Sequence, residues 1–324
     1  MITPEDAAWT RPLGTTGLTV TAIGVGASPL GGLPASDGPG DDRAGGVELV
    51  RAVLRSPLRL VDTANGYRDS ERHIGAAITA EGGLPDDVLV PTKVDPLGGD
   101  YSGDRVRASL AESRERLGLD HLPLVHLHDP EGWDFDDLSA PGGAVDALVA
   151  ARESGEVGRI GLAGGDVHQV RRYLDLGVFD VLLVHNRLTL VDRSAEELVE
   201  AAVGRGLAVV NAAVYGGGAL ARQEPPADGG TEEYAYRPAH PATAQAIRDL
   251  RALCARYGTD LPTAALQHSL RDERVATTLV GMTRVERIDQ VLAAAAAEVP
   301  EDFWAEAAEL VPPREAWVDF QQDR

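Results

Sequence analysis

Four side chains in the sequence have types and a spacing suited to moving a proton: Asp62, Tyr67, Lys93 and His128. A tyrosine with its ordinary pKa of about 10 exchanges protons poorly near neutrality. A neighbouring ammonium would stabilise the phenolate and lower that pKa, and a carboxylate behind the lysine would keep the amine charged. The imidazole would supply a neutral hydrogen-bond donor to the reacting oxygen. The four groups together could protonate a carbonyl as a hydride arrives, or deprotonate a hydroxyl as a hydride leaves.

Taken singly, each of these side chains also has an ordinary structural explanation. Asp62 could brace its loop, and Tyr67 could cover the following helix. Lys93 could hold its charge in solvent, and His128 could hydrogen-bond a loop carbonyl. His126 lies two residues before His128 and so points to the same strand face, where we expect it to be a core histidine. The combination of the four residues indicates a catalytic unit.

Short apolar runs alternate with longer amphipathic segments along the chain. This alternation predicts a parallel sheet, and eight repeats favour a single domain, residues 1–324, folded as a (β/α)8 barrel. An open, doubly wound sheet is the alternative, although no G-x-G-x-x-G opens a helix after a strand. The predicted strands are 21–26, 58–63, 88–93, 123–128, 159–164, 179–184, 207–213 and 276–281; the predicted helices are 43–55, 70–80, 103–116, 139–154, 166–176, 194–204, 241–271 and 284–296.

The barrel would bring the four reactive side chains to one end of the molecule. Asp62, Lys93 and His128 fall at the ends of the second, third and fourth predicted strands, and Tyr67 lies in the loop after the second. Active sites of such barrels are built at the carboxyl ends of the strands. We therefore expect the active site there.

Composition excludes several classes of function. Asp and Glu number 51 against 30 Lys and Arg, and the net charge of −21 repels nucleic acid and anionic membranes. The single cysteine, Cys254, excludes an internal disulfide and a multi-thiolate zinc site, and we expect no metal. The first residues lack a signal-peptide pattern and no segment reaches 18 apolar residues, which predicts a cytoplasmic protein. No sequence feature sets the oligomeric state.

Several segments resemble the aldo-keto reductase family of nicotinamide-dependent oxidoreductases, which fold as (β/α)8 barrels. They are RPLGTTGLTVTAIGVGASPLGG (11–32), VDTANGYRDSERHIGAAI (61–78), PTKVD (91–95) and LGLDHLPLVHLHDP (117–130). The resemblance covers almost the whole chain. It implies that Asp62, Tyr67, Lys93 and His128 form the family's catalytic tetrad, with Tyr67 as the acid/base. It also implies that LGTTGL belongs to a small β-hairpin at the bottom of the barrel.

The resemblance further implies where an NAD(P) cofactor binds. Tyr215 would stack on the nicotinamide, and the glycines after it suit a close approach to the pyrophosphate. The family's usual Ser-Asn pair is replaced by Ala163 and Gly164, and its usual glutamine by Leu183, so Asn186 or backbone groups would hold the carboxamide. The implied cofactor contacts are Gly26, Ala163, Gly164, Asn186, Tyr215, Gly216, Gly217, Gly218, Gly281, Thr283, Arg284 and Arg287.

Two arginines bear on whether the expected cofactor is NAD or NADP. Arg287 falls where family members that bind the 2′-phosphate keep an arginine, and Arg284 could add a second guanidinium. Gly281 replaces a lysine, and an exposed helix face would also carry arginines at this spacing. Both NAD and NADP therefore remain open.

Three further segments set the expected substrate: HDP (128–130), FDVLLVHNRLTLVD (179–192) and EVPEDFWAEAAELV (298–311). They resemble the bacterial L-fucose, D-threo-aldose and galactose 1-dehydrogenases within the family. The implied reaction is oxidation of an aldose at C1 to its lactone, with Asn65 and Asp129 contacting the sugar. The alternatives are an aldehyde or ketone reductase, a cofactor-sensing binding subunit, and an aldolase that uses Lys93 as a Schiff-base nucleophile.

Overall fold

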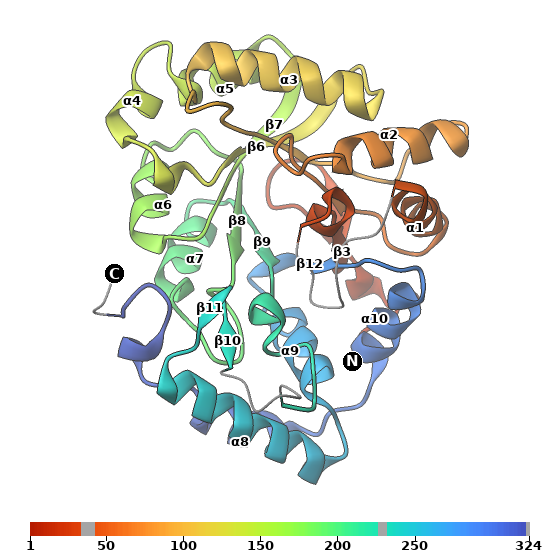
Figure 1. Ribbon diagram of the computed structural model, residues 1–324, viewed down its shortest axis with the longest axis vertical. Coiled ribbons are helices and arrows are strands. Elements are labelled where there is room, and N and C mark those ends of the chain that lie inside the picture. The colour runs from red at the N-terminus through yellow and green to blue at the C-terminus, as the bar shows by residue number, and fades with distance from the viewer. Residues whose placement is uncertain (34–42, 226–231, 322–324) are drawn as a thin grey trace.

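The protein is built around one eight-stranded parallel sheet. The computed structural model describes residues 1–33, 43–225 and 232–321. Neighbouring strands follow the order β4-β3-β12-β9-β8-β7-β6-β5. Figure 1 shows β8 and β9 side by side in the middle of the molecule. The strands are β3 (Ile23–Gly26), β4 (Val61–Asp62), β5 (Thr92–Val94), β6 (Leu122–His128), β7 (Val157–Gly164), β8 (Val181–His185), β9 (Ala208–Ala212) and β12 (Val275–Gly281).

The two ends of this strand order meet and close the sheet. The Val61 amide donates to the Leu89 carbonyl oxygen at 3.0 Å, and the Asn65 amide donates to the Lys93 carbonyl oxygen at 3.1 Å. These bonds join the β4 and β5 segments in parallel, and a parallel bridge pairs Leu60 with Leu89. The sheet is thus a barrel, as the alternation of elements predicted, and not an open sheet.

Helices cover the outside of the barrel. Their apolar faces pack on the strands in one extended core, in which Ile74, Leu110 and Ile247 are fully buried. No helix in the described part of the chain is long and apolar enough to cross a membrane. The helices are α1 (Arg43–Arg55), α2 (Ser70–Ala80), α3 (Gly103–Leu117), α4 (Phe135–Ser139), α5 (Ala144–Glu153), α6 (Val167–Leu174), α7 (Glu196–Val203), α8 (Pro241–Tyr257), α9 (Leu261–Leu270), α10 (Glu286–Ala296) and α11 (Glu301–Glu309).

The structure divides one helix that the sequence analysis predicted as continuous and shortens another. The segment 241–271 breaks because Gly258 adopts a left-handed conformation (φ 69°) that ends α8. Asp260 then caps α9 by accepting a hydrogen bond from the Thr263 amide at 2.7 Å. In the predicted helix 139–154, the helix α5 begins only at Ala144, because Gly142 (φ 80°) precedes it; the short helix α4, which ends at Ser139, was not predicted.

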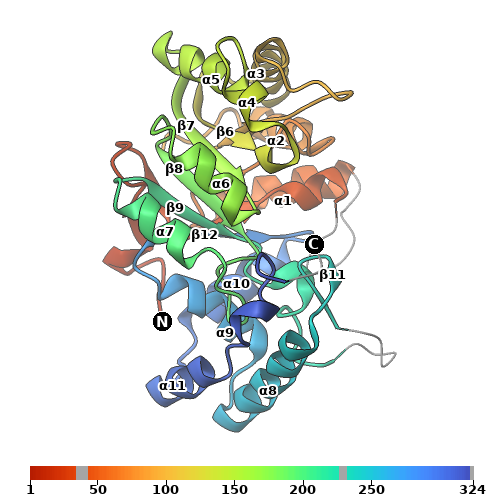
Figure 2. The ribbon, with the colours of Figure 1, turned by 90° about the vertical axis from the view of Figure 1, so that its left-hand side faces the viewer.

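A short hairpin and the helix α11 were not predicted either. The strands β10 (Glu233–Tyr234) and β11 (Arg237–Pro238) form a hairpin. Helix α11 lies beside α8, as Figure 2 shows.

A second hairpin closes the barrel at its bottom, as predicted. Strand β1 (Thr10–Pro12) pairs with β2 (Thr19–Thr21) in antiparallel register. Leu13 and Val20 of this hairpin are each 1% exposed and join the apolar cluster inside the barrel. That cluster includes Val181 and Ala208, the first residues of β8 and β9. The hairpin therefore fills the end of the barrel opposite the carboxyl ends of the strands.

Candidate active site

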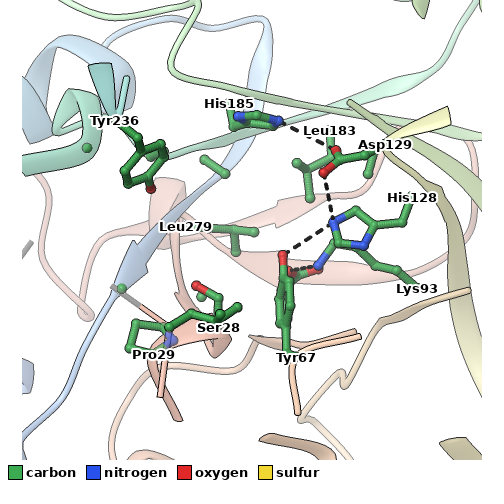
Figure 3. A pocket seen from close by; sticks show the side chains of 18 of the residues that line it. Ser28, Pro29, Tyr67, Lys93, His128, Asp129, Leu183, His185, Tyr236 and Leu279 are labelled. Carbon is green, nitrogen blue, oxygen red and sulfur yellow. Dashed lines mark hydrogen bonds and ion pairs between the residues drawn. The ribbon is translucent and has the colours of Figure 1, made fainter. Parts of the chain in front are cut away.

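A cavity of about 440 Å³ opens at the carboxyl ends of the strands. It is large enough for a small organic molecule or part of a cofactor. Figure 3 shows Tyr67, Lys93 and His128 on one side of the cavity and Tyr236 across from them. Every barrel strand contributes to the lining at or near its carboxyl end: Gly26, Asp62, Lys93, His128, Ala163, His185, Ala212 and Gly281.

The structure brings the four predicted reactive side chains together. Asp62 accepts a hydrogen bond from Lys93 Nζ at 2.5 Å, and the carbonyl oxygen of Thr63 accepts a second at 2.8 Å. Lys93 is 1% exposed, and its Nζ lies 4.7 Å from the centroid of the Tyr67 ring. The Tyr67 hydroxyl lies 3.5 Å from Nε2 of His128. Tyr67 therefore stands between the lysine ammonium and the histidine imidazole (Figure 3).

Burial dominates the proton affinity of the tyrosine. Desolvation raises the pKa of Tyr67 to about 12, although the Lys93 ammonium acts in the opposite direction. The prediction that this pKa lies below its ordinary value is therefore wrong for the ligand-free site. Burial would also lower the pKa of Lys93, but the Asp62 carboxylate and the Tyr67 ring outweigh it, so that pKa is raised. The lysine stays charged.

His128 lies between two carboxylates. Its Nδ1 is 2.7 Å from Oδ1 of Asp95, and its Nε2 is 3.8 Å from Oδ2 of Asp129. Burial lowers the pKa of His128, but Asp95 and Asp129 outweigh that effect, and the pKa is raised above its ordinary value. This environment favours the imidazolium, whereas the sequence analysis expected a neutral donor. His126, below it in the same strand, is 1% exposed, and burial holds its pKa well below the ordinary value.

Sequence reasoning missed two residues of the site, Asp95 and His185. Asp95 directly follows β5, and its side chain is 12% exposed. His185 is the last residue of β8, lines the cavity and places Nε2 3.6 Å from Oδ1 of Asp129. Asp95 lies two residues after Lys93, and His185 lies two residues after Leu183. The sequence analysis had considered both Lys93 and Leu183. Because side chains alternate along a strand, this spacing could have revealed both.

The two predicted substrate contacts have different surroundings. Asp129 lines the cavity and holds a left-handed backbone conformation (φ 41°) after β6. Asn65 faces helix α3 instead: its Nδ2 donates to Glu112 Oε2 at 3.1 Å, and its Oδ1 accepts from Arg105 at 3.2 Å. The prediction that Asn65 contacts the substrate is therefore wrong, because its amide is committed to the helix behind the loop.

The predicted cofactor contacts divide into two groups. Gly26, Ala163, Tyr215, Gly217, Gly218 and Gly281 line the cavity. Gly164, Asn186, Gly216, Thr283, Arg284 and Arg287 lie outside this lining.

The predicted carboxamide contact has turned away from the cavity. The Asn186 side chain is buried, and its Nδ2 lies 3.2 Å from Nδ1 of His185. Leu183 lines the cavity and belongs to the barrel interior, while the strand continues to His185. Ala163, Gly164 and Leu183 replace the residues that usually hold the carboxamide in the family. Of these three, Ala163 and Leu183 line the cavity.

The residues present fit a nicotinamide dinucleotide. Gly216, Gly217 and Gly218 have φ values of 58°, 71° and 108°, which leave a loop without side chains beside the Tyr215 ring. The Arg287 guanidinium lies 5.4 Å from the centroid of that ring. Its Nε is buried and lacks a hydrogen-bond partner among the described residues. A donor without a partner beside a glycine loop suits an anionic group.

Comparison with known proteins agrees with this fold and site. Residues 22–312 match the model of the Aldo/keto reductase family. L-galactose dehydrogenase of Arabidopsis thaliana is 32% identical over 293 residues, which cover 88% of this chain and 87% of the relative. D-threo-aldose 1-dehydrogenase of a Pseudomonas species is 32% identical, with coverage of 91% and 96%. A solved aldo-keto reductase structure from Bacillus halodurans superposes with a TM-score of 0.77 at 21% identity, covering 97% of this chain and 99% of that one.

The (β/α)8 barrel, its closing hairpin and the site at the strand ends define a class of oxidoreductases that use a nicotinamide cofactor. The chain belongs to the aldo/keto reductase family. It is therefore an NAD(P)-dependent oxidoreductase, and its substrate is a small molecule.

Proposed function

We propose that this enzyme oxidises an aldose at C1 to its lactone. The observation that carries the proposal is the carboxylate of Asp129 in the cavity wall, beside His128 and within 3.6 Å of His185. A carboxylate and an imidazole next to the reactive tyrosine suit the hydroxyl groups of a sugar. Two of the relatives carry the names of dehydrogenases of galactose and of threo-aldoses, which supports the same substrate class.

In this reaction the tetrad handles the proton of the C1 hydroxyl. A bound nicotinamide would supply the hydride acceptor for C1, and aldose and NAD(P)⁺ would give lactone, NAD(P)H and a proton. The Tyr67 oxygen accepts the hydroxyl proton, and the Lys93 ammonium stabilises the phenolate that this oxygen must become before it can accept. Asp62 keeps Lys93 charged at a position where burial alone would neutralise it.

The cofactor would lie across the cavity from β3 to α10. Tyr215 would stack on the ring system, and Gly217 and Gly218 would admit the pyrophosphate. Arg287, whose Nε lacks a partner in the described part of the chain, would contact the adenosine side. Gly26 and Gly281 fit this arrangement because they line the cavity and have no side chain that would narrow it.

The opposite direction of the same chemistry is the second candidate. A phenol with a pKa of about 12 is fully protonated near neutrality, so Tyr67 in the ligand-free site is ready to donate a proton to a carbonyl. An NADH-specific methylglyoxal reductase of Escherichia coli is 28% identical over 308 residues. An aldehyde or ketone reductase therefore also fits the site.

A substrate panel separates the two candidates. The purified protein is first titrated with each cofactor by nicotinamide fluorescence. Initial rates are then measured with neutral aldoses and oxidised cofactor, and with small aldehydes and ketones and reduced cofactor. We expect the highest kcat/KM for an aldose. A kcat/KM at least tenfold higher for a carbonyl compound than for any aldose, or reduction of carbonyl compounds with no aldose oxidised, would overturn the proposal in favour of the reductase.

A further inference from the structure

We propose that Asp95 is a positioning residue that fixes the tautomer of His128, so that Nε2 is the ring nitrogen that exchanges the proton with Tyr67. This inference rests on the proposed function in one respect only, the direction in which the proton moves between Tyr67 and His128. The placement of Asp95 itself is independent of the substrate.

One carboxylate contacts both the His128 ring and the turn that carries Tyr67. Oδ1 of Asp95 lies 2.7 Å from Nδ1 of His128, and Oδ2 accepts a hydrogen bond from the Gly66 amide at 2.7 Å. Gly66 directly precedes Tyr67, so the same side chain holds the turn that carries the phenol. No other residue fits at position 66 without movement, because a Cβ there would lie 2.8 Å from Cγ of Asp95.

Helix α3 holds Asp95 in place from behind. The Asp95 amide donates to Ser109 Oγ at 3.3 Å, and its carbonyl oxygen accepts from Arg105 Nε at 3.1 Å. Arg105 in turn forms a two-pronged pair with Glu112 at 2.8 Å for each contact. The backbone of Asp95 is therefore fixed before any substrate arrives.

The bond to Asp95 determines where the imidazole carries its hydrogen. An ionised carboxylate can only accept, so Nδ1 must be the protonated nitrogen. A neutral His128 then presents a bare Nε2, 3.5 Å from the Tyr67 hydroxyl, and can only accept there. A charged His128 has a hydrogen on Nε2 and can only donate.

This arrangement gives the buried phenol a partner for its proton. In oxidation the O–H bond of Tyr67 breaks and an N–H bond forms at Nε2 of His128, while the tyrosine oxygen takes the proton of the substrate hydroxyl. In reduction the same proton returns. Since burial places the pKa of Tyr67 at about 12, such a partner allows oxidation at a pH where free phenolate is scarce.

The charges around His128 set the sign of the pH dependence. The carboxylates of Asp95, Asp129 and Asp62 favour the imidazolium, and Lys93 opposes it. The neutral His126 lies beneath, and His185 faces Asp129 from β8. Because the pKa of His128 is raised, the accepting form appears only as the pH rises through that value. Oxidation should therefore accelerate with rising pH, and reduction should slow.

The direct test is nitrogen NMR of the protein labelled with ¹⁵N-histidine, using His128→Gln only to assign the signal. In the wild type we expect His128 to keep a proton on Nδ1 across the whole pH range and to titrate at Nε2. In Asp95→Asn, the amide oxygen can still accept from the Gly66 amide while the amide nitrogen faces Nδ1. We therefore expect the neutral ring to move its proton to Nε2 and the titration midpoint to fall.

Asp120→Asn is the matched control, because it removes an equal charge from an exposed position. It should leave both the tautomer and the midpoint of His128 unchanged. A wild-type His128 with its neutral-state proton on Nε2 would overturn the proposal, and this result needs no variant to fold. An Asp95→Asn protein with an unchanged tautomer and midpoint would do the same.

A kinetic measurement separates this proposal from the proposed substrate. In Asp95→Asn both the charged and the neutral form of His128 carry a hydrogen on Nε2, so oxidation should lose its acceleration with rising pH, and reduction should lose its decline. Inactivity toward aldoses would remove the substrate assignment and leave the NMR result standing. A normal aldose activity with an unmoved pH profile in Asp95→Asn would remove the role of Asp95 alone.

Discussion

Tyr67 is the residue on which the proposed chemistry depends. Its ring lies 4.7 Å from Lys93 Nζ, and its hydroxyl lies 3.5 Å from His128 Nε2. Replacement by phenylalanine keeps the ring and its packing but removes the hydroxyl. We expect Tyr67→Phe to lower kcat by about 10²-fold or more, the usual value of a positioned proton donor, with cofactor affinity nearly intact. Steady-state kinetics and fluorescence titration measure the two quantities. Retention of a tenth of the wild-type kcat, only about 1.4 kcal/mol of barrier, would remove Tyr67 from this role.

Lys93 is expected to act through its charge. It opposes the desolvation that raises the pKa of Tyr67, so its loss leaves the phenol with a pKa even higher than about 12. A base with a higher pKa is deprotonated only at higher pH. We therefore expect Lys93→Met to suppress turnover and to move the optimum of any remaining oxidation to higher pH. A pH–rate profile is the measurement, and an active variant with the wild-type profile would contradict the coupling.

Spacing along the chain was enough to predict four side chains that the structure brings together, because strand ends and the alternation of side chains are visible in sequence. Spacing could not predict in which direction the side chains of a loop point. Asn65 and Tyr67 lie two residues apart in the same loop, yet Asn65 turns to α3 and Tyr67 to the cavity. The net pKa of Tyr67 could not be predicted either, since it depends on how deeply the finished site buries the ring.

Among the elements, helices α2 and α3 approach each other closely at a glycine. A Cβ at Gly75 would lie 2.1 Å from the carbonyl oxygen of Arg116. In an isolated helix, alanine in place of glycine stabilises by about 1 kcal/mol. Here the overlap forces the helices apart, and we expect Gly75→Ala to lower the free energy of unfolding by about 1–3 kcal/mol. Urea unfolding measures this.

The matched control for that change is Gly204→Ala at the end of α7. Gly204 is exposed and has φ −60°, which alanine adopts without strain. We expect a change within about 0.5 kcal/mol. A Gly75→Ala protein as stable as the wild type would show that the two helices tolerate separation.

The junction of β12 and α10 is where the choice between NAD and NADP should be made. Arg287 carries a buried Nε without a partner among the described residues, while Arg284 is exposed before the helix begins. A charge-assisted hydrogen bond to a 2′-phosphate stabilises by about 1.5–3 kcal/mol before desolvation. We expect activity with both cofactors, and Arg287→Ala should raise KM for NADP more than KM for NAD. Equal effects on both cofactors would show that Arg287 does not contact the 2′-phosphate.

At this scale the order and type of the barrel elements followed from the sequence, and some boundaries did not. The amphipathic pattern runs through 241–271 without a gap, so periodicity alone joined α8 to α9. The sequence does contain the two signals that mark this boundary: Gly258 ends α8, and Asp260 caps the start of α9. Hairpin β10–β11 is too short for a periodic signal, because its two strands have two residues each.

For the whole molecule, contacts between the two ends of the chain argue for one domain. The Ile2 amide donates to the Ala295 carbonyl oxygen at 2.9 Å, and the Arg11 guanidinium donates to the Val275 carbonyl oxygen at 2.9 Å. We propose that residues 1–324 unfold as a unit, since the barrel cannot close without both parts. Calorimetry should record a single cooperative transition. Two resolved transitions would indicate two separately folding parts.

Each strand of the barrel contributes at least one residue to the lining of the cavity that contains Tyr67. The central claim is that this site removes a hydride from C1 of an aldose. The most direct test supplies C1-deuterated aldoses with NAD(P)⁺ and weighs the reduced cofactor by mass spectrometry. The account predicts one added deuterium in the reduced cofactor with the wild-type enzyme and none above background with Tyr67→Phe. Reduced cofactor without deuterium, or no transfer from any aldose while small carbonyl compounds are reduced, would contradict it.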